Sequence, residues 1–159
     1  MTEAQILLAE NNPDDVLLTR QAFAKSGFGN PITVVADGEA CLELLLPGFD
    51  GVGGRAPAGE AAPEPAALRP ALVLLDIDLP KIGGLEVLRR LRGDPSTRLL
   101  PVVILTTSQE RGDIIDGYLL GANSYVCKPI SFTRFVSVVH ALGTYWLRIN
   151  EPCPNPAVA

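Results

Sequence analysis

The sequence predicts an α/β domain in which helices cover both faces of a parallel β-sheet. Short apolar runs alternate with stretches of helical periodicity, as expected of repeated strand–helix–strand units. The apolar runs are unbroken, which is typical of parallel strands buried on both faces. A length of 159 residues suits one domain with a substantial core.

Five apolar runs are the expected strands. The clearest lies in LVLLDIDLP (72–80), where the run follows Pro70 and ends on Asp76 and Asp78. Carboxylates at the tip of a parallel strand lie where open α/β sheets bind ligands. The five runs are QILLA (5–9), ITVVA (32–36), ALVLL (71–75), VVILT (102–106) and SYVCK (124–128).

Helices are expected between these strands. The first has the clearest start, because Asn12 is a good cap, Pro13 suits the first turn, and Asp14 and Asp15 interact favourably with the helix dipole. It is expected to stop at Gly27, since glycine favours helix ends. The remaining helices are expected at 39–46, at 85–93, at about 110–120 and after Ser131.

The segment 47–70 interrupts this alternation. It is rich in Gly, Pro and Ala and has too little apolar bulk to pack, so we expect a mobile loop. It leads into the amino end of the third strand, away from Asp76, and is therefore not expected to cover that residue. The domain is expected to span 4–150, followed by a disordered tail at 151–159.

Bulk properties exclude several classes of function. A formal net charge of −5 argues against nucleic acid as a main partner, since phosphate binding needs a basic surface. No apolar run is long enough to cross a membrane, and the start of the chain has no basic segment typical of a signal peptide. Cys41, Cys127 and Cys153 show no metal-binding spacing, so a cytoplasmic protein with reduced thiols is expected.

Polar side chains follow most of the expected strands. Glu10 and Asn11 end the first, Asp76 the third, Thr106 the fourth and Lys128 the fifth. These tips should converge at one edge of the sheet, where carboxylate oxygens suit Mg²⁺. The hydroxyl and the lysine are suited to holding phosphoryl oxygens, and a carboxylate between them is suited to accepting the group as an acyl phosphate.

Four motifs stand at the strand ends and in the segments that follow them: ILLAEN (6–11), LLDIDLPKIGGLEVL (74–88), ILTTS (104–108) and GANSYVCKPI (121–130). With these motifs, the sequence resembles the receiver domains of two-component response regulators over about residues 4–150. The resemblance implies a flavodoxin-like (CheY-like), doubly wound, five-stranded parallel sheet of order 2-1-3-4-5. It also implies Mg²⁺-dependent phosphotransfer from a histidine kinase and signalling by conformational change, with no enzymatic activity beyond self-catalysed phosphotransfer and slow autodephosphorylation.

By this resemblance, Asp76 is the phosphoacceptor and Lys128 the charge partner of its phosphoryl group. Thr106 is the switch hydroxyl, and Tyr125 is the aromatic side chain that turns inward when the hydroxyl moves. The metal ligands would be Glu10, Asn11, Asp76 and the main-chain carbonyl of Asp78. Asn11 departs from the family, which usually has Asp there, so metal binding is expected to be weakened but not abolished.

Longer features, including TTSQERGDI (106–114), are most similar to single-domain regulators that partner bacterial phytochromes. We therefore expect a stand-alone receiver that signals to a protein partner or relays phosphoryl groups. The apolar stripe on the last helix predicts a homodimer through Tyr145, Trp146 and Ile149. The family resemblance further predicts a cis bond before Pro129.

Three alternatives remain open from the residues alone. Asp76 and Asp78 match the nucleophile and acid–base pair of haloacid-dehalogenase-type phosphatases, although Pro80 stands where that family has Thr or Val. A flavin-binding flavodoxin-like module is a second alternative, but Glu10 would repel the cofactor phosphate. The third is a receiver-like interaction module that is never phosphorylated, for which Asn11 is the only support.

Overall fold

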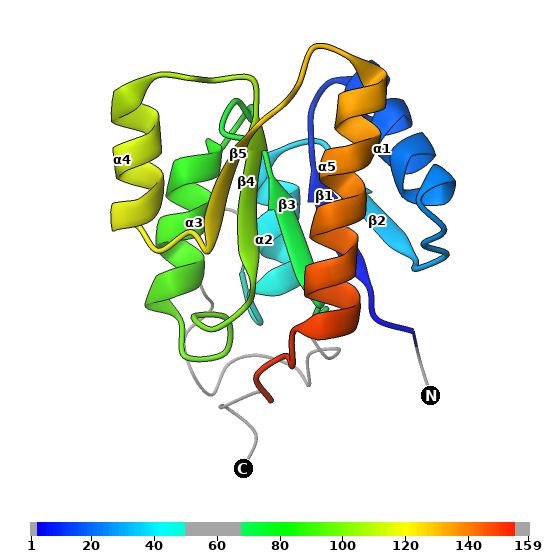
Figure 1. Ribbon diagram of the computed structural model, residues 1–159. Helices are drawn as coiled ribbons and strands as arrows, with labels where there is room; N and C mark the ends of the chain where they lie inside the picture. The colour runs from blue at the N-terminus through cyan, green and yellow to red at the C-terminus, as the bar shows by residue number, and fades with distance from the viewer. Residues whose placement is uncertain (1–2, 50–67, 155–159) are drawn as a thin grey trace.

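The computed structural model describes residues 3–49 and 68–154, and shows five parallel strands in the order β2-β1-β3-β4-β5 (Figure 1). The predicted fold class and strand order are confirmed. The predicted strands are also correct to within one residue at either end. The strands are β1 (Ile6–Ala9), β2 (Ile32–Val35), β3 (Leu72–Leu75), β4 (Val102–Thr106) and β5 (Ser124–Cys127).

Helices connect successive strands and cover both faces of the sheet, α1 and α5 on one face and α2, α3 and α4 on the other (Figure 1). A π-helical segment, Thr144–Ile149, continues from the end of α5. The helices are α1 (Pro13–Lys25), α2 (Gly38–Leu45), α3 (Gly84–Gly93), α4 (Arg111–Leu119) and α5 (Phe132–Gly143).

Side-chain caps fix where three of the helices begin. The Asn12 side chain accepts a hydrogen bond from the Asp14 amide at 2.9 Å, as its predicted capping role requires. Asp37 caps α2 and Ser131 caps α5 in the same way. These short-range bonds hold the first turns of α1 and α5 beside the carboxyl edge of the sheet.

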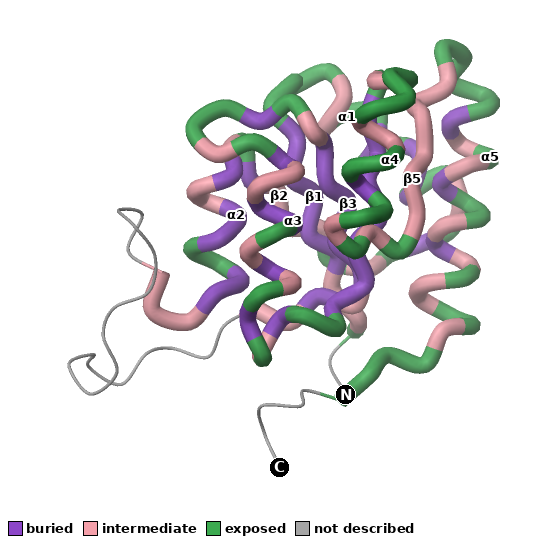
Figure 2. The backbone as a smooth tube through the Cα atoms, turned by 90° about the vertical axis from the view of Figure 1, so that its left-hand side faces the viewer, coloured by how far each residue is buried: buried purple, intermediate pink, exposed green. Residues whose placement is uncertain are grey.

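The core has two layers, one on each side of the sheet. Alternate strand residues point to opposite faces, so Leu74 packs with Phe23 and Phe135 from α1 and α5, whereas Leu75 packs with Leu88 from α3. Figure 2 shows buried residues concentrated along the strands and exposed residues along the outer sides of the helices. This apolar interior holds the strand ends in fixed register.

The described ends of the 47–70 segment lie at the amino edge of the sheet or beside α2. The Leu68 amide donates to the Leu44 carbonyl at 3.0 Å, and the Ala71 amide donates to the Gln5 carbonyl at 2.8 Å. The predicted mobility of the loop and of the tail concerns residues that lie largely outside the described ranges. Within those ranges, no helix is both long and apolar enough to cross a membrane.

Candidate functional site

The carboxyl edge of the sheet brings together the side chains that follow β1, β3 and β5. Strand register pairs Ala9 with Leu75 and Thr106 with Cys127, which places the next residues of the strands level with one another. Glu10 is only 5% exposed, Asp76 7%, and Thr106 is completely buried. Charged groups are seldom buried unless they are paired. The burial of two carboxylates at this edge therefore indicates a functional site.

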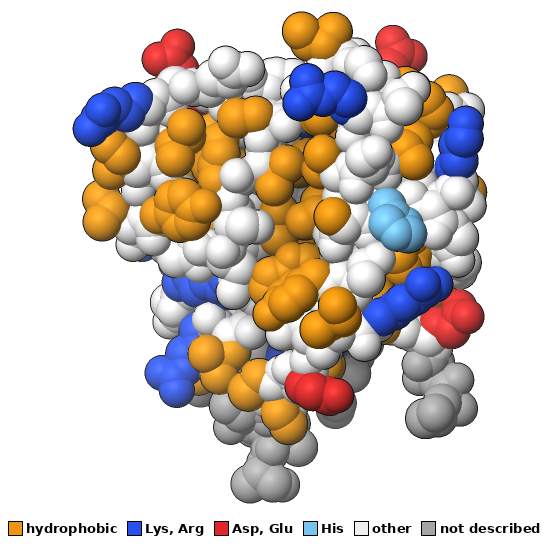
Figure 3. Space-filling view, in the orientation of Figure 1, with side chains coloured by type: hydrophobic (Ala, Val, Ile, Leu, Met, Phe, Trp, Pro, Cys, Tyr) orange, Lys and Arg blue, Asp and Glu red, His pale blue; other side chains and the backbone are white. Residues whose placement is uncertain are grey.

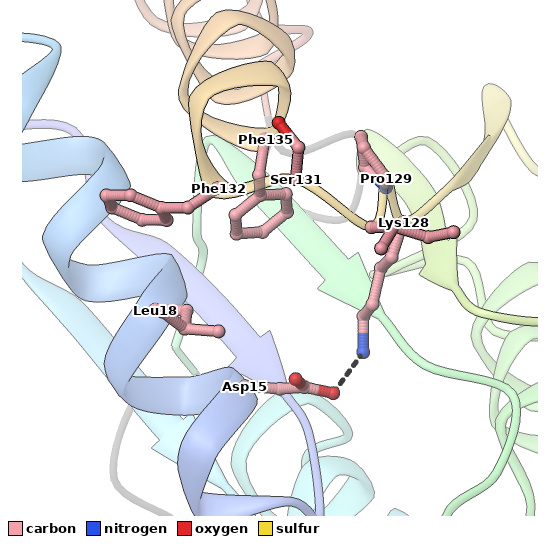
Figure 4. Close-up of a pocket in the computed structure, with 8 residues that line it drawn as sticks. Asp15, Leu18, Lys128, Pro129, Ser131, Phe132 and Phe135 are labelled. Atoms are coloured by element: carbon pink, nitrogen blue, oxygen red, sulfur yellow. Dashed lines mark hydrogen bonds and ion pairs between the residues drawn. The ribbon is translucent and has the colours of Figure 1, made fainter.

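The Lys128 ammonium lies at the centre of the site. Its Nζ is 2.5 Å from Glu10 Oε2, 2.9 Å from Asp76 Oδ2 and 3.1 Å from Asp15 Oδ2. Figure 4 shows the Asp15 side chain reaching from α1 toward Lys128. The lysine side chain is 9% exposed, so these are largely desolvated ion pairs.

Asp76 is held at both carboxylate oxygens. Its Oδ1 accepts hydrogen bonds from the Thr106 hydroxyl and from the Asp78 amide, both at 3.0 Å, while its Oδ2 accepts from Lys128. This arrangement fixes the orientation of the carboxylate.

The two buried carboxyl groups differ in acidity. The pKa of Glu10 is raised to about 7, chiefly by burial and also by the adjacent Asp76 carboxylate, against the lowering effect of Lys128. Burial also acts to raise the pKa of Asp76, but hydrogen bonds from Glu10, from the Asp78 amide and from Lys128 lower it overall. Burial disfavours the Lys128 ammonium, yet the Glu10 and Asp76 carboxylates raise the pKa of Lys128 overall. Asp76 is therefore the ionised member of the pair.

The hydroxyl of Thr106 links Asp76 to the loop that precedes α4. The Ser108 amide donates to Thr106 Oγ1 at 3.4 Å, and the Ser108 carbonyl accepts a hydrogen bond from the Tyr125 hydroxyl at 3.0 Å. The Ser108 hydroxyl donates to Asp113 in the first turn of α4 at 2.6 Å. Ser108 thus connects the predicted switch residues, and the sequence analysis did not single it out.

The oxygen donors at this edge suit a hard divalent cation. Glu10 and Asp76 are buried carboxylates, and hard divalent cations prefer carboxylate oxygens as ligands. Asn11 is exposed at the surface, beside rather than within this pair. In the part of the chain that the structure describes, no three His, Cys, Asp or Glu side chains are arranged as a metal-binding group, and Lys128 lies between the carboxylates.

The prediction of a cis bond before Pro129 is wrong, because the Lys128–Pro129 bond is trans. Trans is the intrinsically favoured form even before proline. The Lys128 amide donates to the Thr106 carbonyl at 2.8 Å, which extends the strand pairing by one residue and already directs the side chain over Asp76. The lysine reaches the site without a cis turn.

The predicted interface residues lie on the π-helical segment after α5. Tyr145 is 48% exposed and Ile149 is 62% exposed, whereas Trp146 is partly buried against the α1–α5 layer of the core. The Tyr145 ring meets the Trp146 ring edge to face, with centroids 4.8 Å apart. The exposed apolar area is therefore supplied by Tyr145 and Ile149 more than by Trp146.

Residues 6–140 match the response regulator receiver domain family. The chain belongs to this family. This match favours the receiver over the phosphatase and flavin-binding alternatives. The Glu10–Asp76–Lys128 cluster is the candidate functional site of this receiver domain.

Several relatives cover nearly the whole receiver. The probable methanogenesis regulatory protein FilR2 of Methanothrix harundinacea is 37% identical over 96% of this chain and 88% of its own length. Response regulator Rcp1 of Synechocystis is 32% identical over 89% of this chain and 88% of its own length.

Solved structures extend the same likeness. The Mn²⁺-bound form of Rcp1 superposes with a TM-score of 0.77 at 28% identity, over 95% of this chain and 99% of that one. The phosphorylated cyanobacterial phytochrome response regulator RcpA superposes with a TM-score of 0.76 at 30% identity, over 96% of this chain and all of that one. The resemblance to phytochrome response regulators is thereby confirmed.

Proposed function

We propose that this receiver accepts a phosphoryl group from a histidine kinase on Asp76, in a reaction that requires Mg²⁺. The observation that carries the proposal is the ionised Asp76 carboxylate, held between the Lys128 ammonium and the Thr106 hydroxyl. Relatives support it, since a solved structure of Rcp1 holds Mn²⁺ and RcpA has been solved in phosphorylated form.

The chemistry follows from the positions of the charged groups. An Asp76 oxygen attacks the phosphorus of a phosphohistidine, the phosphorus–nitrogen bond breaks, and an acyl phosphate is formed. Lys128 is positioned to hold a phosphoryl oxygen, because its Nζ already lies 2.9 Å from Asp76. Mg²⁺ supplies further positive charge when bound, and Glu10 and Asp76 are the carboxylates placed to hold it.

Thr106 is the residue through which the signal leaves the site. Its hydroxyl donates to Asp76 Oδ1, and phosphorylation offers it new acceptor oxygens on the phosphoryl group. A shift of Thr106 would alter the Ser108 amide contact and, through the Ser108 carbonyl, the position of Tyr125. The surface formed by α4 and β5 would then present a different face to a partner protein.

A kinase must bring its phosphohistidine to Asp76, and an apolar surface borders that approach. A cavity of about 80 Å³ lies between α1 and the start of α5, with Lys128 on one wall (Figure 4). Leu18 and Phe132 are each more than a third exposed beside it, and Ile130 is fully exposed. The kinase is expected to dock here, and the relatives make a bacterial phytochrome a reasonable candidate.

Exposed apolar side chains on a second surface support a homodimer. Figure 3 shows apolar side chains spread over the face formed by α4, β5 and α5. Leu119 on α4 is 80% exposed, and Tyr145 and Ile149 lie on the continuation of α5. Tyr145→Glu or Ile149→Glu should convert a dimer into a monomer in sedimentation experiments, whereas a wild-type protein that is already monomeric at micromolar concentration would contradict this.

Phosphotransfer is tested with radiolabelled ATP and purified histidine kinases, a bacterial phytochrome among them. Label should pass to the wild-type protein in the presence of Mg²⁺ and should not pass to Asp76→Asn. Retention of label by Asp76→Asn would refute the assignment of the phosphoacceptor. Failure of the wild-type protein to accept label from any kinase would favour a receiver that is never phosphorylated.

A further inference from the structure

Asp15 is a third carboxylate at the site, and it belongs to a helix and not to a strand end. It lies in the first turn of α1, three residues after the Asn12 cap, and its Oδ2 is 3.1 Å from Lys128 Nζ. The neighbouring Asp14 is exposed and points elsewhere, because successive helix residues face different directions. Asp15 is therefore the acid of this helix end that faces the phosphorylation site.

The position of Asp15 is fixed by its surroundings. The Asn12 cap anchors the first turn, and the Asp15 carbonyl accepts a hydrogen bond from the buried Thr19 hydroxyl at 2.7 Å. The side chain of Asp15 is 29% exposed, which leaves it partly desolvated next to Lys128. A carboxylate held in this way acts on nearby charges more strongly than a mobile surface acid does.

The charges of the site explain why Asp15 matters. Asn11 is neutral, so Glu10 and Asp76 would leave a single net negative charge after Lys128 is counted. Asp15 adds a second. With all three carboxylates ionised, the net charge around Lys128 matches the charge of one divalent cation.

We propose that Asp15 supplies the negative charge that Asn11 lacks, and so maintains the affinity of the site for Mg²⁺. The proposal rests on the proposed function of the site. Asp15 is a positioning residue: it attracts the cation through its charge and holds the Lys128 ammonium from the side of α1, without having to contact the ion. Its role is thus separate from that of Glu10 and Asp76.

Calorimetric titration with MgCl₂, without any phosphodonor, measures this directly. Asp15→Asn should weaken Mg²⁺ binding about tenfold, because it removes one of the two net negative charges around Lys128. Asp14→Asn is the matched control, because it removes the same charge from the same helix turn without a contact to Lys128. It should change the dissociation constant less than about twofold.

A second pair of variants tests the exchange of charge between positions 11 and 15. Asn11→Asp should tighten Mg²⁺ binding, and Asn11→Asp combined with Asp15→Asn should return it close to the wild-type value. Asp15→Ser provides a second neutral variant that favours a helix start, should Asp15→Asn fold poorly by circular dichroism.

The outcomes separate this proposal from the function on which it rests. Equal dissociation constants for the wild type and the neutral variants at position 15 would overturn the role of Asp15 alone. Equal weakening by Asp14→Asn and Asp15→Asn would also overturn it, because the effect would then be long-range charge only. A wild-type protein that binds no Mg²⁺ at millimolar concentrations would overturn the proposed function as well.

Discussion

The two edges of the sheet are built from the same strands but have opposite chemistry. At the amino edge, the contacts include backbone pairs, such as the Ile6 amide with the Pro31 carbonyl, and contacts of neutral side chains, such as Asn123 Oδ1 with the Val102 amide. At the carboxyl edge, Glu10, Asp76 and Lys128 are buried and interact through charged side chains.

The difference shows that the interior of the sheet stabilises this domain, whereas its carboxyl edge carries the functional side chains. Between the two edges, strand residues such as Leu74 are completely buried in apolar layers that favour folding. At the carboxyl edge, one lysine faces three carboxylates, and the raised pKa of Glu10 means that ionising Glu10 opposes folding. The interior holds the strand tips in place, and the tips carry out the chemistry.

The largest expected effect on stability lies in the interior. Leu74→Ala should lower the free energy of unfolding by about 3 kcal/mol, because it leaves a cavity between the sheet and the α1–α5 layer. Leu44, which is 36% exposed on α2, is the control, and Leu44→Ala should cost less than about 1 kcal/mol. Urea denaturation measures both. A smaller loss for Leu74→Ala than for Leu44→Ala would contradict the description of the core.

The next largest effect is expected at Glu10. In contrast to a deletion in the interior, removing this charge at the carboxyl edge should stabilise the fold. The folded-state pKa of Glu10 is about 7, against an ordinary value of 4.5. The contribution of Glu10 to stability is therefore complete below pH 4.5 and is lost as the pH rises to about 7. Glu10→Gln should be about 2 kcal/mol more stable than the wild type at pH 8 and similar to it at pH 4.

Denaturation curves at both pH values test this prediction, with Glu43→Gln on the exposed face of α2 as the control. Lys128, Asp76 and Asp15 are the charged groups that surround Glu10 or share its lysine partner, and all of them remain in the variant. A constant difference between Glu10→Gln and the wild type from pH 4 to pH 8 would show that Glu10 titrates normally.

A smaller effect is expected at the buried hydroxyl. Thr106→Val keeps the shape of the side chain but removes its hydrogen bond to Asp76, and should lower the free energy of unfolding by about 1–2 kcal/mol. Thr107→Val is the control, because Thr107 is exposed one residue later. Thermal or urea unfolding measures both variants. Equal losses in the free energy of unfolding would count against the Thr106–Asp76 hydrogen bond.

The smallest effect concerns thiol reactivity and leaves the fold unchanged. Cys41 is completely buried, and burial raises the pKa of its thiol to about 12, whereas Cys153 is exposed. At pH 8 a thiol reagent should modify Cys153 in the native protein, and Cys41 only after denaturation. In a Cys127→Ser background, which removes the half-buried third thiol, Cys153→Ser should abolish the fast reaction. Fast modification of Cys41 in the native protein would contradict its complete burial.

Much of the fold was predictable because its signals are local. Apolar runs gave the strands, and the Asn12 and Ser131 caps gave two of the helix starts. Parallel strands end at a common edge, so Glu10, Asp76 and Lys128 could be grouped before their contacts were known. Their roles in phosphotransfer remain predictions that the experiments above address.

What escaped prediction depends on tertiary packing. Asp15 meets Lys128 only because α1 is docked against the sheet, and in the sequence it is one more acid in a first helical turn. Ser108 is a loop residue whose partners come from α4 and β5. Trp146 lies on the π-helical segment and is partly buried against the core, and the apolar stripe of the last helix does not by itself distinguish core packing from an interface there.

The central claim is that the carboxyl edge makes Asp76, and no neighbouring acid, the phosphoacceptor. Intact-protein mass spectrometry after incubation with a small acyl phosphate and MgCl₂ tests it most directly, with Asp76→Asn and Asp78→Asn beside the wild type. The wild type and Asp78→Asn should each gain one phosphoryl group, because Asp78 contacts Asp76 through its backbone amide. Asp76→Asn should gain none. Phosphorylation of the Asp76→Asn variant would contradict the account. So would a result in which the wild type is phosphorylated and the Asp78→Asn variant is not.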